Sequence, residues 1–162
     1  MQEKLLLHDA TKTQKALNST NIYPMSLHQS HQRTFEPVPE ELDEIGKKIV
    51  HAAYLVHKAL GPGLLEKIYE ICFCHELRKM GLTVKRQVDI SIVYDDITFE
   101  EGLRLDVLVE DSIICEIKAV DLVYPVWEAQ IISHLKLTGN RLGYLINFNV
   151  VNIGQGIKRF VK

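Results

Sequence analysis

The 162-residue sequence is poor in cysteine and in net charge, and each shortage excludes a class of protein. Its three cysteines, Cys72, Cys74 and Cys115, are an odd number with no second Cys or His pair at a ligand-like spacing. This argues against a disulfide framework and against a structural zinc site. A formal net charge of −2 gives the molecule no overall field that would attract a polyanion, so any contact with nucleic acid has to be local.

Long apolar runs are missing as well. No run approaches the roughly 20 residues that a membrane-spanning helix needs, and the three leucines near the N-terminus are too short for the core of a signal peptide. We therefore expect a cytoplasmic protein without a membrane partner. Hydrophobic residues make up 46% and charged residues 25% of the chain, which is typical of a globular domain.

Hydrophobic periodicity separates a polar N-terminal segment from a single domain. Residues 1–38 show no sustained period and are rich in Asn, Ser, Gln, His and Pro, which predicts a flexible extension. Residues 39–162 alternate between helical and strand periods. The expected order is helix (40–60), helix (64–80), strand (83–96), a turn-like segment (95–101), strand (103–109), strand (113–120), helix (124–139), strand (141–148) and strand (156–162). This order favours an α/β fold with a mixed sheet flanked by helices.

Residues 103–120 form a predicted β-hairpin whose two strands, 103–109 and 113–120, carry four charged side chains. Because side chains alternate between the faces of a strand, burying the apolar side chains of both strands on one side requires an odd-numbered loop centred on Asp111. Asp106 then lies opposite Glu116, and Arg104 lies opposite Lys118.

Two facing carboxylates, with Cβ atoms about 5 Å apart, repel each other unless a cation lies between them. Mg²⁺ prefers oxygen ligands, and a bound divalent ion activates water and neutralises phosphate charge. Asp106, Glu116 and Lys118 therefore make a set that is able to cleave a phosphodiester. The alternative is an ordinary solvated ladder, in which Arg104 and Lys118 pair with the two carboxylates.

Five ordered blocks of the chain resemble the GxxExxY proteins, a group within the PD-(D/E)XK nuclease superfamily, which has a restriction-endonuclease-like core. The first block carries the motif residues Gly63, Glu66 and Tyr69. The resemblance covers about residues 40–162. The blocks are GPGLLEKIYE (61–70), RLDVLV (104–109), EIKAV (116–120), QIISHLKLTG (130–139) and GYLINF (143–148).

The resemblance implies that Asp106 and Glu116 are metal ligands for Mg²⁺ or Mn²⁺ and that Lys118 is the catalytic lysine. Glu66 matches an additional acidic residue that often reaches the metal. Glu70, one helical turn further on, is an alternative to Glu66 because either of them can face the site.

Gln130 resembles the glutamine of a QxxxY motif that lies beside the active site in RecB-type nucleases. This resemblance implies that Gln130 is a catalytic residue, like Asp106, Glu116 and Lys118. The chain departs from the motif, because His134 stands at the tyrosine position. It also has Leu105 where the superfamily name has Pro. Arg104, His134 and Tyr69 are candidate substrate-binding residues.

The sequence predicts a metal-dependent nuclease that hydrolyses phosphodiester bonds in DNA or RNA, with nucleic acid and a second copy of the chain as expected partners. The alternative is a non-catalytic module that binds nucleic acid or protein on the same fold. A thiol enzyme that uses Cys115 fits poorly, because Cys115 points to the apolar face, where burial raises a thiol pKa.

Overall fold

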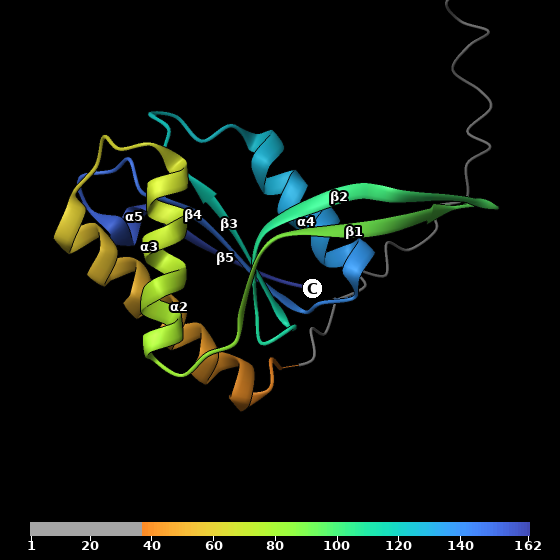
Figure 1. Cartoon of the computed structure of the whole chain (residues 1–162), viewed down its shortest axis with the longest axis horizontal. Helices are drawn as coiled ribbons and strands as arrows, with labels where there is room; N and C mark the ends of the chain where they lie inside the picture. Colours follow the sequence, from red (N-terminus) through yellow and green to blue (C-terminus); the bar gives the residue numbers. More distant parts are fainter. Residues whose placement is uncertain (1–36) are drawn as a thin grey trace, which may run out of the picture. The chain divides into compact units, whose positions relative to one another are not determined.

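The computed structural model describes residues 37–162, so the extension expected at residues 1–38 lies almost wholly outside the described residues. The elements, labelled as in Figure 1, follow the order expected from the sequence, with one short helix added before the last strand. They are α2 (Glu40–Leu60), α3 (Glu66–Lys79), β1 (Val84–Tyr94), β2 (Ile97–Val109), β3 (Ile113–Lys118), α4 (Pro125–Thr138), β4 (Leu142–Asn147), α5 (Ile153–Gly156) and β5 (Ile157–Val161).

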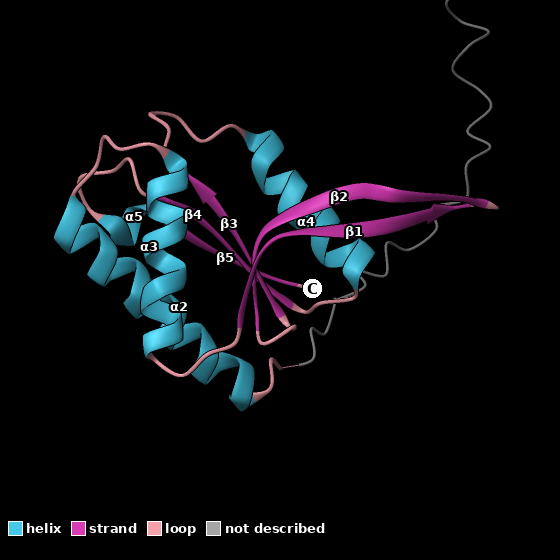
Figure 2. Cartoon of the chain, viewed as in Figure 1, coloured by secondary structure: helices cyan, strands magenta, loops and turns pink. Residues whose placement is uncertain are grey.

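The five strands form one mixed sheet in the order β1-β2-β3-β4-β5. Strands β3 and β4 are parallel, and the other neighbours are antiparallel. Helices α2 and α3 pack on one face of the sheet, and α4 packs on the other (Figure 2). The architecture is the α/β, restriction-endonuclease-like fold that the sequence predicts. No helix within residues 37–162 has the length and apolar character to cross a membrane.

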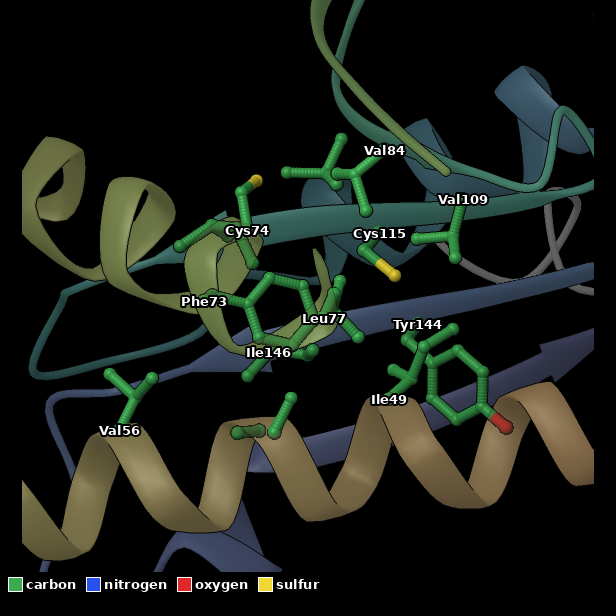
Figure 3. Close-up of a cluster of buried hydrophobic side chains, with 14 of the residues drawn as sticks. Ile49, Val56, Phe73, Cys74, Leu77, Val84, Val109, Cys115, Tyr144 and Ile146 are labelled. Atoms are coloured by element: carbon green, nitrogen blue, oxygen red, sulfur yellow. The ribbon is translucent and has the colours of Figure 1, made fainter. Parts of the chain in front are cut away.

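Helix α2 supplies most of one wall of the main core. Three carboxylates in its first turn oppose the positive end of the helix dipole, and Gly61, with φ of +66°, ends the helix by donating its N–H to the carbonyl of His57 at 2.8 Å. Its fully buried stripe includes Ile49 and Val56, which meet side chains of α3 and of the sheet (Figure 3).

Helix α3 buries only part of the side that its apolar residues suggest. Tyr69, Phe73 and Leu77, which are spaced four residues apart, are fully buried. Leu65 and Ile68, which the sequence pattern places in the core, are 77% and 41% exposed. The helix begins only at Glu66, so Leu65 lies outside it.

The segment at 95–101 is not a turn, as we had expected, but largely strand. Only Asp95 and Asp96 form the turn, and β1 and β2 pair from Val84 and Val109 out to Tyr94 and Ile97. Strands β2 and β3 pair only at three positions. The outer halves of β1 and β2, residues 90–103, therefore leave the sheet as a two-stranded ribbon (Figure 1), which we call the arm.

The predicted register of the β2–β3 hairpin is confirmed, since Val107 pairs with Cys115 and Val109 with Ile113. The expected strict alternation along β2 is wrong, however. Leu105 packs with Leu108 on the side of α4, whereas Val107 belongs to the main core. The alternation is interrupted at Asp106, whose facing position on β1 is Gln87, a residue with φ of +50° that is missing from the ladder. Because helices cover both faces of the sheet, both faces are partly apolar.

Candidate active site

The structure brings Asp106, Glu116 and Lys118 together at the end of β3. The Lys118 Nζ atom lies 3.4 Å from Asp106 Oδ2 and 3.9 Å from Glu116 Oε2. It also donates a hydrogen bond to the carbonyl oxygen of Ile117 at 2.9 Å. Oxygens of three residues thus surround one cationic group, in a position that a hard metal ion would also favour.

Asp106 is held by the backbone of the neighbouring strand. Its Oδ2 atom accepts a hydrogen bond from the Ile117 N–H at 3.0 Å. Beyond Cys115, β3 has no strand partner on this side, because β2 has turned away into the arm. The carboxylate takes the place of the missing backbone acceptor, and the same Oδ2 atom also lies 3.4 Å from Lys118 Nζ.

Glu116 is only 2% exposed, and its Oε1 atom lies 3.0 Å from Nδ1 of His134 on α4. Since an ionised carboxylate only accepts hydrogen bonds, the imidazole donates from Nδ1. Burial raises the pKa of Glu116, and nearby Asp106 raises it further, while the hydrogen bond and charge of His134 and the charge of Lys118 lower it in part. The net pKa is above the ordinary value, so the carboxylate is costly when it is ionised without a further cation.

Glu66 and Glu70 have different surroundings. Partial burial raises the pKa of Glu66, and Lys118, Asp106 and the Ala119 N–H also act on it, so Glu66 lies beside the site. Glu70 turns toward β1 instead, where it accepts hydrogen bonds from Arg86 Nε at 2.7 Å and Gln87 Nε2 at 2.9 Å. Glu70 thereby holds Gln87, the β1 residue that faces Asp106.

Tyr69 is fully buried and does not reach a substrate, which contradicts its place among the candidate binding residues. Its hydroxyl donates to the carbonyl of Gly61 at 2.7 Å and accepts the N–H of Leu64 at 3.0 Å. The ring stacks on Phe148 with centroids 4.7 Å apart. Tyr69 therefore fastens the loop that leads into Glu66, and Gly63 in that loop has φ of +97°, which favours glycine.

Two other candidates differ in their placement. Arg104 does not face Lys118, because β2 leaves β3 after Val107; its Nε donates to Asp89 Oδ1 at 2.6 Å on the exposed arm. Gln130 is half-buried on α4, one turn before His134, and its side chain makes no hydrogen bond to the residues described. Gln130 is thus available to a ligand, whereas Arg104 is not placed at the site.

Asn147, at the end of β4, is a supporting residue that the sequence reasoning missed. It is buried, and its side chain bonds both the N–H and the carbonyl of Val120 at 3.1 and 2.8 Å. These bonds hold the segment directly after Lys118. A polar residue that ends an otherwise apolar strand was the available signal.

The sequence model of the PD-(D/E)XK nuclease superfamily matches residues 43–160, from within α2 to within β5. The chain belongs to this superfamily. The match agrees with the fold. No curated protein and no solved structure matches the chain.

The carboxylates of the site can be compared with the ligands that a bound metal ion requires. Within residues 37–162, no three His, Cys, Asp or Glu side chains gather closely enough to hold an ion as they lie. The donor chemistry nevertheless fits Mg²⁺ or Mn²⁺, since Asp106 and Glu116 offer carboxylate oxygens around a position already favourable to a cation. Cys115 offers no competing chemistry, because burial raises its thiol pKa well above the usual value.

Replacing Glu70 tests its anchoring role. We expect Glu70→Ala to lower the free energy of unfolding by about 2 kcal/mol, because Arg86 and Gln87 lose their buried acceptor. The control is Glu44→Ala, which removes an exposed ion pair with Lys47 and should cost less than about 0.5 kcal/mol. Urea denaturation measures both values, and equal losses would contradict the role given to Glu70.

The raised pKa of Glu116 predicts a pH-dependent stability. A carboxyl whose folded pKa lies above its unfolded value contributes stability below the unfolded pKa and loses it as the pH rises through the folded one. In the presence of a chelator, Glu116→Gln should therefore have a higher urea midpoint than the wild type at pH 7. The difference should shrink as the pH falls toward the ordinary carboxyl pKa of 4.5. A wild type that is equally stable or more stable at pH 7 would show that the ionised Glu116 is not costly.

Proposed function

We propose that the chain is a metal-dependent nuclease of the GxxExxY group that hydrolyses phosphodiester bonds in nucleic acid. The observation that carries the proposal is the convergence of the Asp106 and Glu116 carboxylates on the Lys118 ammonium at the end of β3. These residue types occur in the order that the superfamily name describes, within a chain that belongs to that superfamily.

The assignment to the GxxExxY group is supported by the way in which its three motif residues act together. Gly63 allows the loop conformation, Tyr69 bonds that loop at both ends, and Glu66 follows directly at the start of α3 beside Lys118. The motif is therefore a device that brings one acidic residue to the site.

The roles of the residues follow from their contacts. Asp106 and Glu116 would hold the divalent ion, with Glu66 close by, and when bound this ion supplies charge neutralisation and a more acidic water. The Lys118 ammonium is able to donate to a phosphate oxygen and to stabilise its charge. His134 keeps the Glu116 carboxylate in place, and Gln130 offers a free amide to the substrate.

One observation favours a second candidate, a non-catalytic binding module. Lys118 already lies near both Asp106 and Glu116, and His134 already hydrogen-bonds Glu116, so both carboxylates have partners without a metal. A chain that had kept the fold and lost the reaction would show the same arrangement.

Cleavage assays test the proposed activity. Single- and double-stranded DNA and RNA are incubated with the full chain and Mg²⁺ or Mn²⁺. We expect metal-dependent cleavage of at least one substrate, reduced at least about a hundredfold in Lys118→Ala because charge stabilisation at the phosphate is lost. The control is Lys58→Ala, an exposed lysine at the end of α2, which should cleave at the wild-type rate. Undiminished cleavage by Lys118→Ala would refute the assignment.

Metal binding is measured separately from activity by thermal unfolding. We expect Mn²⁺ at ten times its Kd to stabilise the wild type by about 1.4 kcal/mol, a rise of several degrees in Tm. Asp106→Asn should lose this rise while it keeps an oxygen for the Ile117 N–H, and the control Asp96→Asn, in the exposed turn of the arm, should retain it. A wild type whose Tm ignores millimolar Mn²⁺ would favour the binding module.

A further inference from the structure

One face of the arm is largely apolar, although the β1–β2 register shifts between Ile90 and Ile92. Facing residues of an antiparallel pair point to the same side, so the pairing of Tyr94 with Ile97 and of Ile92 with Phe99 makes one side of the ribbon apolar. The opposite side carries Val93 paired with Thr98 and, at the base of the arm, Asp89 paired with Arg104. Although they are apolar, Tyr94 and Ile97 are 69% and 56% exposed.

The inner end of this face is part of a core. Val88, Ile90 and Leu103 pack against a buried cluster that includes Leu105 and Leu135. The same face then runs outward to the tip, where nothing within residues 37–162 covers it. Two-stranded ribbons are marginally stable alone, so an apolar ribbon that extends from a core indicates an interaction surface.

Helix α4 provides a second uncovered apolar surface beside the arm. Its inward side buries Ile131 and Leu135. Its exposed side carries Val126 and Leu137 at one edge and Ile132 at the other, on either side of Ser133 and Lys136. A hollow lined by residues of the arm base and of α4, among them Ile90 and Leu137, lies between the two surfaces.

The charges of the two surfaces decide which occupant fits. Residues 90–103 contain Asp95, Asp96, Glu100 and Glu101 and no Lys or Arg, so the arm repels phosphate and also repels a second arm. The outward side of α4 instead carries Lys136, which makes no ion pair among the residues described. An acidic apolar ribbon is therefore complementary to the α4 surface and not to nucleic acid or to itself.

We propose that two copies of the chain associate through these surfaces, with the apolar face of each arm lying on the outward side of α4 of the other copy. Such a contact is isologous, because each copy gives its arm and receives its partner's, and the two-fold arrangement closes at two copies. The proposal concerns assembly and is independent of the proposed nuclease function.

Two neighbouring residues of the arm provide a matched test. Tyr94 and Val93 are 69% and 68% exposed but lie on opposite faces. Sedimentation velocity of the full chain at micromolar concentration should show a dimer. Tyr94→Glu should raise the dimer Kd at least about tenfold, because it places a charge in the apolar contact, whereas Val93→Glu should leave the Kd unchanged. A monomeric wild type, or equal effects of the two variants, would overturn the proposal.

Disulfide trapping distinguishes the arm–helix contact from an arm–arm contact. Ile97→Cys and Ile132→Cys are introduced into separate copies, which are mixed and oxidised, with the wild type as the control for its three native cysteines. The proposal predicts that the mixed disulfide-linked dimer forms faster than either variant's dimer with itself. Faster self-linkage of Ile97→Cys, or weakened nucleic-acid binding by Tyr94→Glu with an intact dimer, would refute it.

Discussion

The bond from the Ile117 N–H to the Asp106 carboxylate is the interaction on which the rest of the structure depends. Strand β2 pairs with β3 over only three positions and then bends away, which would leave β3 with an unpaired donor at a buried edge. The Asp106 side chain supplies the acceptor. Asp106 therefore lies where the β2–β3 ladder ends and β2 turns toward the arm, and its carboxylate lies beside Lys118. The left-handed Gln87 on β1, held by buried Glu70, makes room for the same bend.

The site that results is an electrostatic compromise. Glu116 is buried next to another carboxylate, which raises its pKa, and the protein offsets this cost with the His134 hydrogen bond and the Lys118 ammonium. Glu66 is raised in pKa for similar reasons at the other side of the cluster. Neighbouring acidic groups with raised pKa values are typical of catalytic and ligand-binding sites. The same contacts give both carboxylates a partner before any cation is added.

Sequence patterns predicted the parts of the molecule in which local periodicity and global packing agree. The order of elements and the register of Val107 with Cys115 followed from alternation and from turn length. The pattern failed where the sheet is not locally uniform. Arg104 was placed opposite Lys118 because a strand was assumed to continue straight, and Leu65 was placed in the core because helical periodicity does not reveal where a helix begins.

By itself, the sequence determined the α/β fold, the superfamily motif and the identity of the residues Asp106, Glu116 and Lys118, because these depend on residue type and on spacing along the chain. Only the tertiary structure decided that Glu66 lies beside Lys118 whereas Glu70 pairs with Arg86. It also decided that the Tyr69 hydroxyl hydrogen-bonds the loop before α3 and that His134 hydrogen-bonds Glu116. It also showed that β1 and β2 continue into an arm. These outcomes depend on where a strand bends and which helix lies over it, and such long-range contacts have no signature within a local window of residues.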